Sequence, residues 1–214
     1  VFGALTLWYV GRADEAQRWA LEGCRLAHEI GHAFSELNAS SVASTLFLLC
    51  GDAERARELH LKAESLSEEH GYAISLAPQL RSVIFEPNPA AAASRLDLLE
   101  KNMVAAANRG EIQMQNVDLL MLSHARRHAG RLERALESLK EGIEIAERTD
   151  DRWYEAELLR LQANLLVEVE GSYPEIRDRA DELLHRSLKV AESQGAKAWT
   201  LRTACSLCRL HQDT

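Results

Sequence analysis

Apolar and polar residues alternate along this chain with the period of an α-helix, and glycine or proline turns interrupt the pattern at regular intervals. The turns lie at Gly11, Gly51, Pro87–Pro89, Gly130 and Gly171, about 40 residues apart. Between the turns, apolar residues recur three and four positions apart, which is typical of amphipathic helices. The pattern therefore predicts a series of helical pairs.

Each turn separates the two helices of a pair, and a final helix follows the last pair. The predicted helices are 1–10, 13–29, 33–49, 52–69, 72–86, 90–108, 112–128, 131–148, 152–169, 175–194 and 196–211. Asp52 is expected to cap the helix that it precedes by accepting a backbone N–H bond. Pro89 and Pro174 stand where a first-turn proline is tolerated. Pro78 falls inside a helical pattern and is expected to kink or break that helix.

Small residues recur at fixed distances after the turn glycines. Alanine stands five residues after the glycine, glycine or alanine stands twelve after, and a large apolar residue stands fifteen after. These columns contain Ala16, Ala56 and Ala135, then Gly23, Ala63 and Gly142, then Leu26, Leu66 and Ile145, while Ala180, Ser187 and Val190 take the same places in the last pair. Two helices approach closely only where side chains are small, and large residues fill the flanking space. The columns therefore predict that successive hairpins stack.

Stacked hairpins of this kind predict an all-α fold, a right-handed superhelix (α-solenoid) of about five hairpins plus a terminal helix. We expect one repeat domain over residues 1–214. The expected repeats are 1–31, 32–71, 72–110, 111–150 and 151–195, followed by the terminal helix 196–211. The third repeat is the least regular, because Arg95 and Asn102 stand where small residues are expected.

The order of glycine, alanine and small residue resembles the tetratricopeptide repeat (TPR), although the repeat here exceeds the usual length of about 34 residues and lacks the closing proline. The stretches RWYEAELLRLQANLL and RADELLHRSLKVAESQGAKAWTLRTACSLCRL, with the preceding LLMLSHARRHAGRLERALESLKEGIEIAERTDDRW, resemble the terminal repeats of large bacterial signalling proteins. Over residues 1–110 the resemblance rests on spacing.

In that family a class III adenylate or guanylate cyclase domain, or a LuxR-type DNA-binding domain, comes first. A STAND ATPase follows, and then a helical-repeat tail. The resemblance implies that this chain is a regulatory tail cut from a longer protein. The chain contains no Walker-type glycine loop followed by Lys-Ser or Lys-Thr, so the resemblance does not extend to nucleotide hydrolysis here.

Composition narrows the classes of partner. The net charge is −8 and no basic face is evident, so direct binding to nucleic acid is not expected. No run of eighteen apolar residues occurs, which argues against a membrane span. The four cysteines lack the density of a secreted disulfide framework, so we expect reduced thiols in a cytoplasmic protein.

Two short motifs suggest metal chemistry, and each has a simpler explanation. Cys205 and Cys208 form a C-x-x-C pair with His211 nearby, but a four-ligand zinc site needs a second pair, so helix packing is the favoured interpretation. His124 and His128 are spaced i, i+4, but arginines flank them, which favours a polar stripe over a cation site. We therefore predict no catalytic residue, metal or cofactor, and an enzyme is not expected.

In a TPR-like stack the first helix of each pair lines the concave groove. The groove positions predicted on this basis are Asn38, Ser41, Thr45, Gln79, His124, Arg127 and His128. These side chains suit a protein or peptide segment, and His124, Arg127 and His128 suit an anionic group. We therefore expect a non-catalytic scaffold that regulates an attached signalling domain. Two alternatives remain open: a sensor for a small-molecule effector, and a self-assembly module that forms a homodimer.

Overall fold

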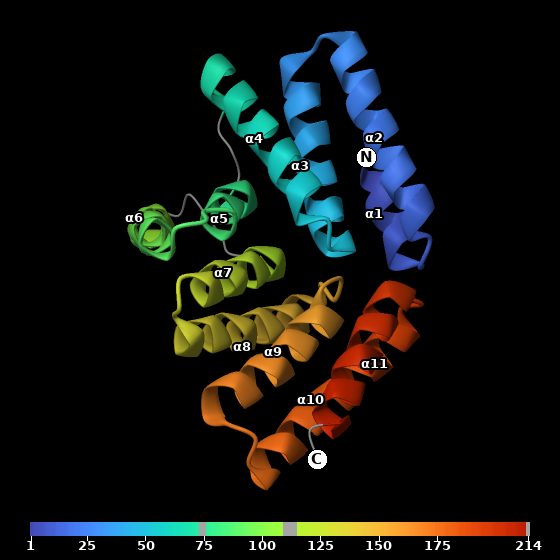
Figure 1. The fold of residues 1–214 in the computed structure, drawn as a ribbon, viewed down its shortest axis with the longest axis vertical. Helices are drawn as coiled ribbons and strands as arrows, with labels where there is room; N and C mark the ends of the chain where they lie inside the picture. The colour runs from blue at the N-terminus through green and yellow to red at the C-terminus, as the bar shows by residue number, and fades with distance from the viewer. Residues whose placement is uncertain (73–75, 109–114, 213–214) are drawn as a thin grey trace. The chain divides into compact units, whose positions relative to one another are not determined.

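The computed structural model describes residues 1–72, 76–108 and 115–212, with the side chains of residues 77 and 107 excepted, and these residues form α-helices joined by short turns (Figure 1). The prediction of an all-α fold is confirmed. The helices are α1 Phe2–Tyr9, α2 Ala13–Ile30, α3 Ala33–Cys50, α4 Ala53–His70, α5 Leu76–Ile84, α6 Pro89–Asn108, α7 Asn116–His128, α8 Leu132–Thr149, α9 Glu155–Glu170, α10 Pro174–Ser193 and α11 Lys197–Gln212.

The chain divides into two compact units, Val1–Pro78 and Gln79–Thr214. In the first unit α1 packs on α2, α2 on α3 and α3 on α4. In the second unit α7 through α11 pack on one another in chain order, and α6 contacts α7. From α1 to α4 and from α6 to α11, helices that are neighbours in the sequence are therefore neighbours in space, as the hairpin pattern predicts.

The turn between α3 and α4 shows how the sequence reverses the chain. Gly51 adopts a left-handed conformation with φ of 84°, which a side chain disfavours. Asp52 N–H then donates to the carbonyl of Phe47 at 2.9 Å. The Asp52 carboxylate accepts from the backbone N–H of Arg55 at 3.0 Å, which confirms the predicted cap. Asp150 takes the same left-handed role after α8, with φ of 57°.

The prolines begin helices. Pro89 is the first residue of α6 and Pro174 the first of α10, as predicted. Pro78 was expected to interrupt a helix over 72–86, but α5 begins at Leu76 and Pro78 lies in its first turn. Because first-turn N–H groups have no helical acceptor, Pro78 removes no hydrogen bond there and requires no kink.

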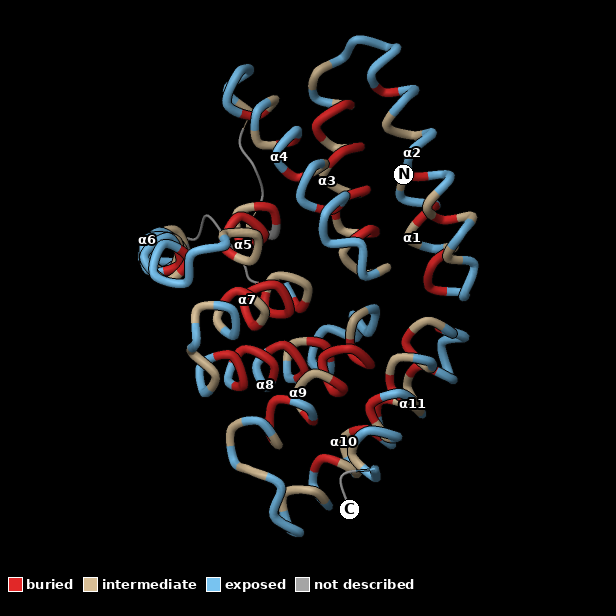
Figure 2. The backbone as a smooth tube through the Cα atoms, viewed as in Figure 1, coloured by how far each residue is buried: buried red, intermediate tan, exposed pale blue. Residues whose placement is uncertain are grey.

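The small-residue columns lie at the helix contacts. The alanines five residues after the turn are at most 1% exposed, and Ala63, Gly142 and Ser187 of the second column are also buried. Two further columns, nine and sixteen residues after the turn, complete the buried stripe. They contain Ala20, His60, Leu139 and Leu184, then Ala27, Ser67, Ala146 and Ala191. Figure 2 shows such stripes as buried segments that recur along each helix.

The large residues of the third column flank the helix contacts, as predicted, and are less buried than the small residues. Leu26 is 45% exposed, and Leu66, Ile145 and Val190 are half-buried. With about 100° of rotation per residue, the buried columns fall within one narrow sector, whereas the fifteenth position lies about 60° outside it. Leu26 and its counterparts therefore border the contact.

Helix α3 is long and apolar enough, by length and composition, to cross a membrane. It also packs between α2 and α4 and buries polar residues, including Ser40 and Ser44. The Ser44 hydroxyl donates to the carbonyl of Ala56 at 2.7 Å. These contacts are compatible with the core helix of a soluble protein.

A group of charged residues joins α6 to α7 and α8. Glu100 accepts from Arg126 Nε at 2.8 Å and from Arg131 and Arg134 at 3.2 and 3.4 Å. Arg131 also donates to Asp97 at 2.7 Å. Because Glu100 is only 16% exposed and binds three guanidinium groups, it is the central acceptor of this contact.

Replacing Gly142 by leucine tests the close helix contact. A Cβ atom at position 142 would lie 3.1 Å from a methyl carbon of Leu158 and 3.4 Å from the Cβ of Leu119. We expect Gly142→Leu to lower the free energy of unfolding by about 1–3 kcal/mol through overpacking, measured by chemical denaturation. Glu141→Leu, one position away on the exposed face, is the control. Equal stability of the two variants would show that position 142 tolerates bulk.

Replacing Glu100 by glutamine tests the charged contact. We expect Glu100→Gln to destabilise the protein by about 1–2 kcal/mol, because three guanidinium groups lose their shared anion. Hydrogen exchange should accelerate in α6 in particular. Glu141→Gln removes an equal charge from an exposed position of α8 and serves as the control. Unchanged exchange in α6 would contradict the role given to Glu100.

Candidate functional site

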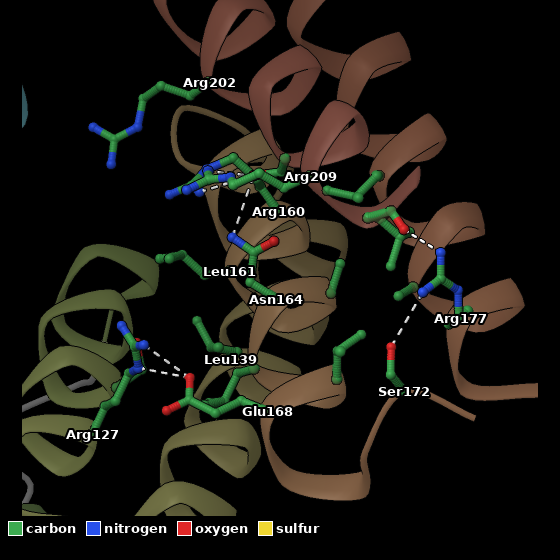
Figure 3. Close-up of a pocket in the computed structure, with 18 of the residues that line it drawn as sticks. Arg127, Leu139, Arg160, Leu161, Asn164, Glu168, Ser172, Arg177, Arg202 and Arg209 are labelled. Atoms are coloured by element: carbon green, nitrogen blue, oxygen red, sulfur yellow. Dashed lines mark hydrogen bonds and ion pairs between the residues drawn. The ribbon is translucent and has the colours of Figure 1, made fainter. Parts of the chain in front are cut away.

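A cavity of about 430 Å³ opens among α7, α8, α9, α10 and α11 of the second unit. Five arginines line it. They are Arg127 from α7, Arg160 from α9, Arg177 from α10, and Arg202 and Arg209 from α11. Figure 3 shows Arg160 and Arg209 close together, with Arg127 and Arg177 on different sides of the space. The site is therefore a cleft with cationic groups along several of its edges.

One wall of the cleft is apolar. Ala163, Ala180 and Leu184 form a fully buried cluster where α9 meets α10, and each is 1% exposed. Val167 and Leu210 pack against this cluster and are partly buried. Aliphatic surface and guanidinium groups therefore face the same space.

Arg160 is held by a buried ion pair. Its Nε and Nη2 donate to the two carboxylate oxygens of Glu157, at 2.7 and 2.6 Å. Arg160 is 5% exposed and Glu157 is 2% exposed. Arg202 on α11 adds a third bond to Glu157 at 3.0 Å. This bidentate geometry compensates for the loss of water around both charges and fixes the orientation of the Arg160 side chain.

Three nitrogen donors converge on the hydroxyl oxygen of Ser206. Arg160 Nη1 and the Asn164 amide each lie 3.3 Å from it, and Arg209 Nη2 lies 3.4 Å from it. Ser206 is 2% exposed. The hydroxyl is therefore surrounded by donors from α9 and from its own helix.

Arg127 and Arg177 bond to groups other than Glu157 and Ser206. Arg127 binds the Glu168 carboxylate, with nitrogen–oxygen distances of 3.0 and 2.9 Å. Arg177 donates to the Ser172 hydroxyl at 3.3 Å and to the carbonyl of Leu210. Five guanidinium groups therefore line one cavity in a chain whose net charge is −8.

His124 also lines the cleft, where burial lowers the pKa of its imidazole from 6.5 to about 4. The Glu157 carboxylate opposes this shift, and Arg160, Arg202 and Arg127 reinforce it. His124 is therefore a neutral hydrogen-bonding group at pH 7, and the positive charge of the cleft comes from arginine.

The structure places the predicted groove residues in both units. Asn38 and Thr45 bond to carbonyls of their own helix, at Phe34 and Ser41 respectively. These positions belong to α3 in the first unit, and Gln79 lies on α5 at the start of the second.

His124 and Arg127 line the same cleft, whereas His128 is exposed and bonds to the carbonyl of Glu86 at 2.8 Å. The structure therefore brings together two of the seven predicted positions around the arginine-lined cavity.

Four arginines of the cleft were not among the residues predicted from the sequence: Arg160, Arg177, Arg202 and Arg209. Only Arg160 carries a local signal. Glu157 and Arg160 stand three apart in a predicted helix, where opposite charges can pair, and the structure buries all six residues from Glu155 to Arg160. The other arginines look like ordinary surface positions until the fold brings α10 and α11 beside α9.

The interpretation of Cys205 and Cys208 as packing residues is wrong, because both are exposed. Helix α11 buries Trp199, Thr203 and Ser206, one face at i, i+4 and i+7, and the cysteines lie off that face. Within the described ranges, no three His, Cys, Asp or Glu side chains gather in a way that could hold a metal ion.

Removing His124 should flatten the pH dependence of stability. Folding lowers the pKa of His124, so the unfolded chain takes up the proton first as the pH falls. The contribution of His124 to the free energy of unfolding is therefore fully present above pH 6.5 and declines toward pH 4. We expect wild type to lose on the order of 2 kcal/mol more than His124→Gln across this interval. Chemical denaturation at several pH values measures the difference, and His185→Gln, exposed on α10, is the control. Parallel curves for wild type and His124→Gln would contradict the shift.

Comparison with known proteins adds little to this description. No family model matches the chain. The chain is similar to an uncharacterized protein, R02095, of Rhizobium meliloti (strain 1021), with 26% identity over 211 residues. That alignment covers 97% of this chain and 20% of the relative. The chain thus spans about a fifth of the length of the curated relative that it matches.

Proposed function

We propose that this chain is a non-catalytic, TPR-like interaction module of a larger signalling protein, and that its second unit binds an acidic segment of a protein partner. The observation that carries the proposal is the arginine-lined cleft. Five arginine side chains line one cavity in a chain that is acidic as a whole. Guanidinium groups suit carboxylates because their planar N–H donors match both oxygens.

The regulatory part of the proposal rests on the resemblance to helical-repeat tails of bacterial regulators. In this proposal the helical pairs continue as a right-handed superhelix, and the attached domain is a cyclase or a transcription regulator. Partner binding would favour one arrangement of the repeats over another and so shift the conformational equilibrium of the attached domain. Packing between consecutive hairpins within each unit supports this proposal, because such contacts transmit a change from one repeat to the next.

A second candidate is a small-molecule effector. The cavity volume of about 430 Å³ falls in the range of about 300–1,000 Å³ that small-ligand sites occupy. Its apolar wall, which includes Val167 and Leu210, would receive an aliphatic portion of such a ligand. Native mass spectrometry of the purified chain separates the candidates, since a tightly held effector adds a discrete mass that denaturation removes.

Selection from a displayed random-peptide library tests the proposed function. We expect peptides selected on the 214-residue chain to be enriched in Asp and Glu, and increasing salt to weaken their binding. The double variant Arg127→Gln, Arg209→Gln should lose this enrichment, whereas Arg148→Gln, Arg18→Gln, which removes the same charge from exposed positions elsewhere, should keep it. Selected peptides without acidic enrichment, or equal behaviour of the two double variants, would refute acidic-segment binding at the cleft.

A further inference from the structure

We propose that Arg160, Asn164 and Arg209 form a subsite for one carboxylate of the bound segment, and that an apolar residue two positions away in that segment contacts Val167 and Leu210. This inference rests on the proposed function and specifies its ligand. It predicts an extended Glu-x-Leu type of motif, in which one acidic and one aliphatic side chain point the same way.

The nitrogen donors around Ser206 outnumber the lone pairs of its hydroxyl oxygen. Its hydroxyl oxygen offers two lone pairs, yet three nitrogens approach it, at 3.3, 3.3 and 3.4 Å. These distances exceed the usual range of about 2.7–3.2 Å for such bonds. A single neutral oxygen therefore satisfies this group of donors poorly, and an added anionic oxygen would take shorter, charge-assisted bonds from them.

Two positively charged groups, Arg160 and Arg209, lie at this end of the cleft. Arg160 directs Nε and Nη2 to Glu157, and its Nη1 is directed to Ser206. Arg209 donates to two neutral oxygens, the Cys205 carbonyl and the Ser206 hydroxyl. Two guanidinium groups thus converge on an uncharged oxygen. A carboxylate beside Ser206 would reduce their mutual repulsion without displacing Glu157.

Apolar surface beside the donor group favours a carboxylate that is followed by an aliphatic side chain. Leu210 follows Ser206 by four residues on α11, so its side chain lies one helical turn away, about 5–6 Å between Cβ atoms. Residues two apart in an extended peptide lie about 7 Å apart on the same face. The spacing from Ser206 to the partly buried Leu210 therefore suits an acidic and an aliphatic side chain two positions apart, and Val167 packs against the same apolar cluster as Leu210.

Short capped peptides provide the probe. The test peptide is acetyl-Ser-Glu-Ser-Leu-Ser-amide, which carries one carboxylate and one aliphatic side chain. One control replaces its Glu by Gln, and another replaces its Leu by Ser. NMR titration of the 214-residue chain follows the backbone amides and the arginine Nε–H signals. We expect Arg160 and Arg209 signals to shift, and each control peptide to bind at least about fivefold more weakly.

Protein variants locate the carboxylate. Arg209→Gln should weaken the test peptide by about tenfold, whereas Arg148→Gln, which removes the same charge from an exposed site on α8, should bind as wild type does. Arg209→Lys should be intermediate, because it keeps the charge and loses the planar fork. Comparable affinity of Arg209→Gln and wild type, or equal binding of the Ser control peptide, overturns the subsite.

Two further outcomes separate this inference from the function on which it rests. If the library selection yields acidic peptides that bind in the cleft but Arg209→Gln leaves their affinity unchanged, the subsite is wrong and the proposed function stands. If neither the test peptide nor any acidic peptide binds wild type, both are wrong. Tighter binding of hexanoate than of the test peptide, with the same dependence on Arg209, contradicts the peptide ligand and favours the small-molecule effector.

Discussion

The close approach of helix backbones is the constraint on which the rest of this structure depends. Helices can pack at short distance only where side chains are small, and the alanines at positions 16, 56 and 135 are fully buried at such contacts. The same contacts bring hydroxyl groups within reach of neighbouring carbonyls. Ser44 bonds to Ala56 in the first unit, and Ser187 bonds to Ala156 in the second, at 2.7 and 2.6 Å. Packing and hydrogen bonding therefore hold the two helices of these hairpins against each other.

This packing explains why a charged pair is buried in the second unit. Helix α9 contacts α8, α10 and α11, so most of its surface is covered. Glu157 and Arg160 lie on covered faces, where an isolated charge would be very costly. A buried ion pair adds little net stability compared with apolar residues of the same size. In this protein the ion pair fixes the orientation of the Arg160 side chain, which directs its Nη1 toward Ser206.

The elements were predictable because they depend on local signals. Glycine turns, capping residues such as Asp52 and the helical period together gave all eleven helices of the described ranges. The cleft was not predictable, because it depends on residues far apart in the chain. Arg160 and Ser206 are 46 positions apart, and nothing near Ser206 in the sequence indicates that donors will surround it. The depth of burial was not predictable for residues that flank a contact, since Leu26 borders its contact and is 45% exposed.

The arginines of the cleft differ in what a ligand must displace. Arg127 forms a half-exposed pair with Glu168, and exposed ion pairs contribute about 0–1 kcal/mol, so a ligand carboxylate can exchange with Glu168 at small cost. Arg160 keeps Glu157, because separating that buried pair would leave an uncompensated charge. At Ser206 a ligand oxygen would compete only with long bonds to a neutral hydroxyl. The cleft thus combines a rigid guanidinium group on its floor with exchangeable ones at its edge. This arrangement favours recognition of an anionic group while the helices remain packed.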